Sequence, residues 1–128
     1  MLFHIDPNNG LAIYEQIARQ VKFAVAGGSL RSGHMVPSVR ELARELAINP
    51  NTIARAYRQL QDDGVLEAVR GTGLEVAPGA LERCRQERLD MIRARLRQVL
   101  AEARQSQLDP DEIRALVEAE LSLMHQEA

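Results

Sequence analysis

Residues 37–76 read PSVRELARELAINPNTIARAYRQLQDDGVLEAVRGTGLEV, and this stretch decides the fold. It predicts two short helices joined by a tight turn, followed by a β-hairpin that carries Arg70-Gly71-Thr72-Gly73 at its tip. This order of elements is a helix-turn-helix with a wing, an arrangement that places one helix in a DNA groove. No stretch of the chain has a pattern suited to catalysis.

Capping residues mark where the two helices begin and end. Ser38 and Glu41 form an S-x-x-E capping box, which predicts a helix start at Ser38. Asn49 is a good N-cap, and Pro50 is preorganised for the first helical position, so the next helix is expected to begin there. Gly64 is expected to end it.

The helix that begins at Asn49 has distinct inward and outward faces. Ile53, Tyr57 and Leu60 recur at helical spacing and are expected to be buried. The residues expected to face outward are Asn51, Thr52, Arg55, Arg58 and Gln59. A helix start offers free backbone N–H groups to a phosphate, while Asn and Arg side chains can read adenine and guanine edges. This face is therefore predicted to contact DNA; a solvated polar helix start is the alternative.

Cations flank the predicted groove-binding helix on both sides. Arg40 lies in the first turn of the preceding helix, where a cation opposes the helix dipole, so a phosphate partner would explain it. An ion pair with Glu41 or Glu45 is the alternative. The glycines of the hairpin tip permit positive φ and a close approach to DNA, and Arg70 suits a narrow minor groove. The predicted DNA-binding residues are Ser38, Arg40, Asn51, Thr52, Arg55, Arg58, Arg70, Gly71 and Gly73.

The flanking sequence completes a mainly α-helical winged-helix domain with one small β-hairpin. Residues 11–26 have apolar positions at helical spacing, and residues 29–37 are expected to form a loop. Pro78-Gly79 breaks the pattern. We expect a DNA-binding domain at residues 1–78 and a helical dimerisation or effector tail at residues 79–128.

The tail predicts two helices, at about residues 80–105 and 110–125. In the first, Leu89, Ile92, Leu96 and Val99 recur with coiled-coil-like spacing. The second is expected to bury Ile113, Leu116, Val117, Leu121 and Met124. The seam of the first helix is too long for one short partner helix, so we expect it to pack against a second subunit. Packing against residues 110–125 alone is the alternative.

The net charge of −2 argues mildly against nucleic-acid binding. Its distribution weakens that argument, because residues 1–78 carry eight basic and eight acidic side chains, while residues 79–128 carry eight and ten. DNA binding requires a local basic patch and not a basic chain. We expect a modest affinity that falls with salt.

Composition also excludes several classes of protein. No apolar run has the length of a membrane span, and the N-terminus does not read as a signal peptide. The single Cys84 excludes an internal disulfide and fits a reducing cytosol. Three scattered histidines and one cysteine do not predict a metal site, and no catalytic constellation or cofactor motif is found.

The stretch PSVRELARELAINPNTIARAYRQLQDDGVLEAVRGTG resembles the DNA-binding domain of GntR-type bacterial transcriptional regulators, and AIYEQIARQV resembles the usual start of that domain. NPNTIARAY and the short two-helix tail resemble the YtrA subfamily. The resemblance implies a dimeric winged-helix repressor on a palindromic operator, often one that controls transporter genes. By position, it assigns phosphate contact to Arg40, recognition to Asn51, Thr52 and Arg55, and wing contacts to Arg70 and Gly71.

The sequence departs from that family at four positions. Ala12 replaces a proline at a helix start. Ala47 replaces a turn glycine, which costs roughly 1 kcal/mol if the position needs positive φ. Pro50 and Ala54 stand where many relatives carry arginine, which shifts the predicted DNA recognition onto the neighbouring polar residues.

Two functions other than a DNA-binding regulator would fit a chain of this kind. A winged helix can serve as a protein–protein adaptor, which steeply salt-dependent DNA binding would exclude. A small enzyme is the other rival, and it lacks a catalytic constellation. A small-molecule effector is left open: the tail is too short to enclose a large pocket, but a ligand between tail and winged helix would change the spacing of two recognition helices.

Overall fold

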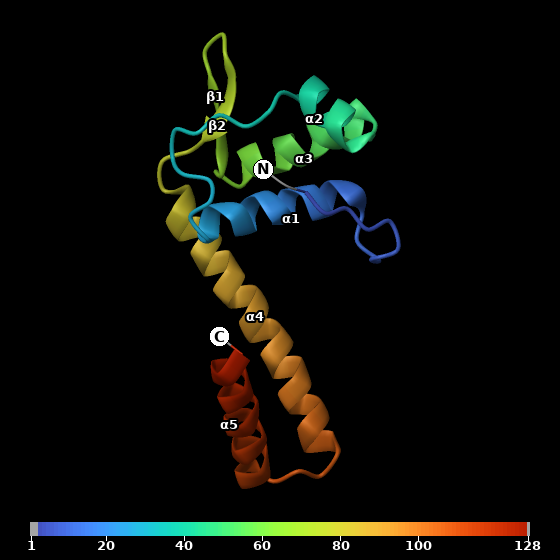
Figure 1. Ribbon diagram of the computed structural model, residues 1–128, viewed down its shortest axis with the longest axis vertical. Coiled ribbons are helices and arrows are strands. Elements are labelled where there is room, and N and C mark those ends of the chain that lie inside the picture. Colours follow the sequence, from blue (N-terminus) through green and yellow to red (C-terminus); the bar gives the residue numbers. More distant parts are fainter. Residues whose placement is uncertain (1–2, 128) are drawn as a thin grey trace. The chain divides into compact units, whose positions relative to one another are not determined.

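The computed structural model describes residues 3–127 and shows a mostly helical chain with one β-hairpin (Figure 1). Its elements in order are α1 (Ile13–Ala26), α2 (Val39–Leu46), α3 (Pro50–Asp62), β1 (Leu66–Val69), β2 (Gly73–Val76), α4 (Ala80–Gln105) and α5 (Pro110–Glu127). They divide into two compact units, one up to Arg88 and one from Leu89 onward. The predicted fold class is confirmed.

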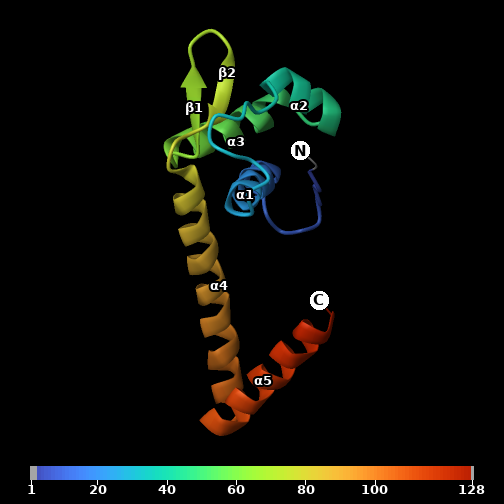
Figure 2. The same cartoon turned by 60° about the vertical axis from the view of Figure 1, so that its left-hand side comes forward.

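The core of the first unit lies between α1, α2, α3 and the hairpin. Ile17 of α1, Leu42 of α2 and Ile53 and Leu60 of α3 are completely buried. Helices α1 and α3 lie side by side in both views (Figures 1 and 2). The predicted inward stripe of α3 is confirmed, since Tyr57 is buried as well.

The predicted helix caps are present. The Ser38 hydroxyl accepts a hydrogen bond from the Glu41 N–H at 3.1 Å, and the Glu41 carboxylate accepts one from the Ser38 N–H at 3.3 Å. Ala47 ends α2 in the left-handed conformation, with φ 54° and ψ 45°. The turn between α2 and α3 therefore does require positive φ, and alanine occupies it at a conformational cost.

The segment before α2 is more regular than the predicted loop. The two hairpin strands pair antiparallel, with Val69 opposite Gly73. Along the other edge of β2, the Val36 N–H donates to the Leu74 carbonyl at 3.0 Å and the Val76 N–H donates to the His34 carbonyl at 2.9 Å. Residues 29–37 form no helix or strand, as predicted, but their second half is held by these hydrogen bonds and by an isolated bridge between Met35 and Glu75. An open β2 edge would leave backbone groups unpaired, and this segment pairs them.

The first turns of α4 belong to the first unit. Ala80 and Cys84 are buried in its core, and burial raises the pKa of the Cys84 thiol. The Lys22 ammonium bridges the carboxylates of Asp63 and Glu87 at 2.7 and 2.8 Å. The compact unit thus runs ten residues past the expected boundary at residue 78, and the division at that residue stays a prediction.

The second unit consists of the remainder of α4 and of α5, and it has no buried core within the described residues. Within its described residues no side chain is buried: Leu89, Ile92, Leu96 and Val99 are 50–58% exposed. The prediction that α5 buries Leu116, Val117, Leu121 and Met124 was wrong, because these side chains are 41–64% exposed. The two helices diverge from their connection (Figure 2), so neither covers the apolar face of the other. None of the described helices is both long and apolar enough to cross a membrane.

Candidate nucleic-acid interface

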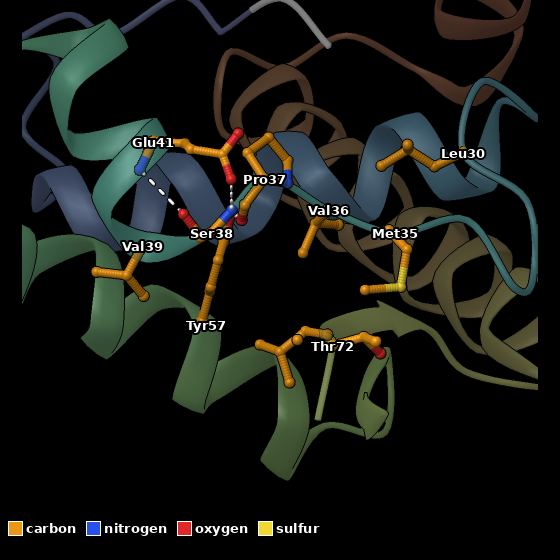
Figure 3. Close-up of a pocket in the computed structure, with 11 residues that line it drawn as sticks. Leu30, Met35, Val36, Pro37, Ser38, Val39, Glu41, Tyr57 and Thr72 are labelled. Carbon is orange, nitrogen blue, oxygen red and sulfur yellow. Dashed lines mark hydrogen bonds between the residues drawn. The ribbon is translucent and has the colours of Figure 1, made fainter. Parts of the chain in front are cut away.

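Three elements of the first unit form the candidate interface: the start of α2, the helix α3 and the hairpin. The hairpin tip and α2 rise on the same side of α3 in both views (Figures 1 and 2). Between them is a groove of about 790 Å³ (Figure 3). Ser38 and Gly73, two of the predicted DNA-binding residues, line this groove although they are far apart in the sequence.

Tyr57 fixes the floor of this groove. Its hydroxyl donates a hydrogen bond of 2.7 Å to the Pro37 carbonyl, which holds the chain at the entry to α2. Burial, with a smaller effect from the nearby carboxylates of Glu41 and Glu45, raises the pKa of Tyr57. The hydroxyl therefore keeps its proton and remains a donor at neutral pH.

The polar face of α3 is exposed as predicted. Asn51, Arg55 and Arg58 are exposed, and Thr52 is half-buried. The backbone at this helix start differs from expectation, because the Asn49 side chain accepts from the Asn51 N–H at 2.8 Å and the Asn49 carbonyl accepts from the Thr52 N–H at 3.0 Å. With proline at residue 50, the expected free N–H groups are absent from the start of α3 as described. Any recognition there depends on side chains.

Arg40 and Arg70 are exposed cations without partners. Within residues 3–127, neither guanidinium has a hydrogen bond, an ion pair or a ring contact. The alternative ion pair of Arg40 with Glu41 or Glu45 is therefore not formed, since the Glu41 carboxylate is held in the capping box. Two guanidinium groups are left available to an external anion.

The hairpin tip has the backbone conformation that its glycines predict. Gly71 and Gly73 have φ of 79° and 122°, values that L side chains rarely adopt. No atom outside the adjoining residues lies within 4 Å of the position that a Cβ of Gly71 would occupy. The tip is thus open on the side where a partner would approach.

Arg55 differs from the other arginines of the interface. Its guanidinium lies over the ring of Tyr14, 3.9 Å from the ring centroid. This contact joins α1 to α3 across 41 positions of sequence. Sequence reasoning missed it, because only the packing of the two helices brings the residues together.

The chemistry available to this site is non-covalent recognition. Among the described residues, no group of three or more His, Cys, Asp or Glu side chains is arranged to hold a metal ion. Around the groove, α2, α3 and the hairpin carry exposed guanidinium, amide and hydroxyl groups and the glycines of the hairpin tip, which are the groups that contact phosphates and base edges.

Comparison with known proteins gives the same assignment. The family profile described as "Bacterial regulatory proteins, gntR family" matches residues 13–76. The chain is 36% identical over 102 residues to the HTH-type transcriptional repressor YtrA of Bacillus subtilis, covering 80% of this chain and 78% of that protein.

Solved structures agree over nearly the whole chain. A transcriptional regulator from Oenococcus oeni is 28% identical with a TM-score of 0.81, covering 94% of this chain and 99% of that one. YtrA from Sulfolobus acidocaldarius, a GntR-family transcription factor, is 32% identical with a TM-score of 0.61, covering 79% and 99%. These relatives are transcriptional regulators and not enzymes. The chain belongs to the gntR family of bacterial regulatory proteins, as a DNA-binding transcriptional regulator of the YtrA type.

Proposed function

We propose that this regulator is a repressor that binds a palindromic operator as a homodimer, with α3 of each subunit in the major groove. The observation that carries the proposal is a set of exposed groups on α2, the hairpin and α3 that have no partner within residues 3–127: the guanidinium groups of Arg40 and Arg70, and the side chain of Asn51. The hairpin then contacts the backbone or the adjacent minor groove through Arg70 and its glycines. The likeness to YtrA proteins supports transporter genes as targets.

The charge of the winged-helix region supports a dimer as the binding species. Residues 1–78 carry equal numbers of basic and acidic side chains, so long-range attraction between one copy and DNA is weak. Two linked copies bind with the advantage of a high effective concentration, on the order of 10²- to 10⁴-fold. The exposed apolar seam Leu89-Ile92-Leu96-Val99 is the surface we propose for linking them.

Substitutions at two arginines test the orientation of the DNA face. Arg55→Ala should lose about 1–3 kcal/mol of operator binding and relax specificity at one base pair, because its groups contact a base edge. Arg40→Ala should weaken binding to all DNA sequences similarly. It should also reduce the salt dependence of the affinity by about the amount that one phosphate contact contributes. Footprinting and fluorescence anisotropy at several salt concentrations measure both effects.

A matched control is Arg104→Ala near the end of α4, which removes the same charge from the second unit and outside the seam. It should bind as the wild type does. If Arg40→Ala and Arg55→Ala also footprint like the wild type, the DNA face is assigned wrongly. If operator binding is weak and insensitive to salt, a protein–protein adaptor, which the near-neutral charge also fits, becomes the better assignment.

A further inference from the structure

We propose that Tyr14 is a positioning residue for DNA recognition: its ring holds the guanidinium of Arg55 in place on the outer face of α3. The proposal begins from the 3.9 Å between the Arg55 guanidinium carbon and the Tyr14 ring centroid. A cation this close to an aromatic face is attracted by the ring quadrupole. The inference rests on the proposed role of Arg55 in contacting DNA.

The Tyr14 ring is itself held by the protein. It lies at the start of α1, partly buried against the core of the first unit. Its hydroxyl donates a hydrogen bond of 3.1 Å to the Glu15 carboxylate. Because α1 and α3 pack along each other (Figure 1), the ring is a fixed platform for a side chain that leaves α3.

Stacking leaves the recognition groups of Arg55 available. The guanidinium is planar, and a ring covers its face while the five N–H donors lie along its edge. Those donors are the groups that pair with the O6 and N7 atoms of guanine. Arg55 remains exposed with the ring beneath it, so it can be oriented and accessible at once.

The consequence of the platform is preorganisation. A free arginine side chain samples many rotamers, and ordering it on binding reduces affinity. Arg40, Arg58 and Arg70 have no comparable support within the described chain, whereas Arg55 is already restricted before DNA arrives. The ring therefore favours one Arg55 geometry, and with it one base at the contacted position.

Two substitutions at Tyr14 distinguish the effect of the aromatic ring from the effect of an apolar side chain at that position. Tyr14→Leu keeps an apolar side chain against the core but removes the aromatic face. It should weaken operator binding about two- to tenfold and reduce discrimination at the same base pair that Arg55→Ala affects. Tyr14→Phe keeps the aromatic face and loses only the hydroxyl, so it should retain the operator affinity and the base discrimination of the wild type. Anisotropy with matched and single-mismatch operators measures these changes.

A double-mutant cycle distinguishes positioning from a structural role. In an Arg55→Ala background, Tyr14→Leu should change operator affinity by less than about twofold, because there is no guanidinium left to position. Equal losses from Tyr14→Leu in both backgrounds, or an equal loss in Tyr14→Phe, would overturn the inference. Tighter binding by Tyr14→Leu would also overturn it, since the ring would then be withholding Arg55 from DNA.

The failure of this inference is distinguishable from the failure of the proposed function. If Arg55→Ala binds and discriminates as the wild type does, the assignment of Arg55 to the DNA face has failed and Tyr14 has nothing to position. If Arg55→Ala is impaired and Tyr14→Leu is not, only the role of Tyr14 is wrong. Thermal unfolding of each variant checks that the first unit remains folded.

Discussion

The winged-helix unit and the α4–α5 tail use equally regular apolar patterns with opposite results. In the first unit, Leu42, Ile53 and Leu60 are completely removed from solvent, whereas in the second Leu96 and Val99 remain 50% and 58% exposed. Three helices and a hairpin can surround a core, but two diverging helices cannot. Periodicity predicts that a helix face is apolar, and it does not say whether the same chain covers that face.

This difference implies two kinds of stability. A core closed within one chain has a free energy of unfolding that does not depend on concentration. A face covered by a second copy is stabilised by mass action, so its stability rises with protein concentration. Substitutions in the two units should therefore respond differently to protein concentration.

The largest effect is expected from charges placed in the tail seam. The double substitution Ile92→Glu and Leu96→Glu should abolish the proposed dimer, because two buried carboxylates per subunit would lack partners. Operator affinity should then fall about 100-fold or more, since linkage of two half-site contacts is lost. Sedimentation measures the oligomeric state and anisotropy the affinity.

Gln98→Glu is the matched control, because it adds a charge to an exposed position of the same helix outside the seam. It should stay dimeric. A doubly substituted variant that sediments as the wild type does would show that this seam is not the dimer interface.

A paired truncation should give the next largest effect. Leu42→Ala should cost about 2–5 kcal/mol of unfolding free energy, the same at all protein concentrations, because it leaves a cavity in a closed core. Leu96→Ala should cost more at high protein concentration than at low concentration, because the contribution of its side chain appears only where the dimer forms. Denaturant unfolding over a hundredfold concentration range checks this; parallel losses for both variants would mean the two units do not differ in kind.

Local features of the fold could be predicted from sequence, and distant contacts could not. The capping box at Ser38 and the positive φ of the hairpin glycines depend on a few neighbouring residues, and both are present. The pairing of His34 and Val36 with β2, and the stacking of Arg55 on Tyr14, depend on how separate elements pack. These contacts leave no periodic signal in either segment.

The candidate site divides in the same way. The outward face of α3 follows from its inward stripe, so the exposure of Asn51 and Arg55 was predictable. The N-cap role of Asn49 was predicted too, but its consequence was not drawn: the side chain and the carbonyl of Asn49 take the N–H groups that were expected to be free for a phosphate. The DNA contacts assigned to these side chains stay predictions.

The ion-pair network of Lys22 should have a smaller effect that depends on pH. Burial alone would lower the pKa of Lys22, but hydrogen bonds with Asp63 and Glu87 outweigh it and raise that pKa. Partial burial would raise the pKa of Asp63, but hydrogen bonds from Lys22 and Gln59 lower it. The stabilisation is therefore lost as pH falls through the lowered pKa of Asp63 or rises through the raised pKa of Lys22.

Lys22→Met should accordingly lower the free energy of unfolding by about 1–2 kcal/mol between roughly pH 5 and 9, and by less outside that window. Thermal or denaturant unfolding across pH measures it. The control is Arg114→Met in the tail, whose ion pair with Asp111 is largely exposed and should contribute no measurable stability. A loss from Lys22→Met that is independent of pH would assign its role to packing of the aliphatic chain.

The smallest effects are expected at two strained turns, one in each unit. Ala47 and Gln107 have φ of 54° and 65°, and glycine relieves that strain. Ala47→Gly should raise the unfolding free energy by about 1 kcal/mol at any concentration. Gln107→Gly should favour the α4–α5 turn, but it should raise the unfolding free energy only at concentrations where the tail has formed the proposed dimer. Ala101→Gly inside α4 should destabilise by about 1 kcal/mol; a loss from Ala47→Gly as well would mean that chain entropy exceeds the strain.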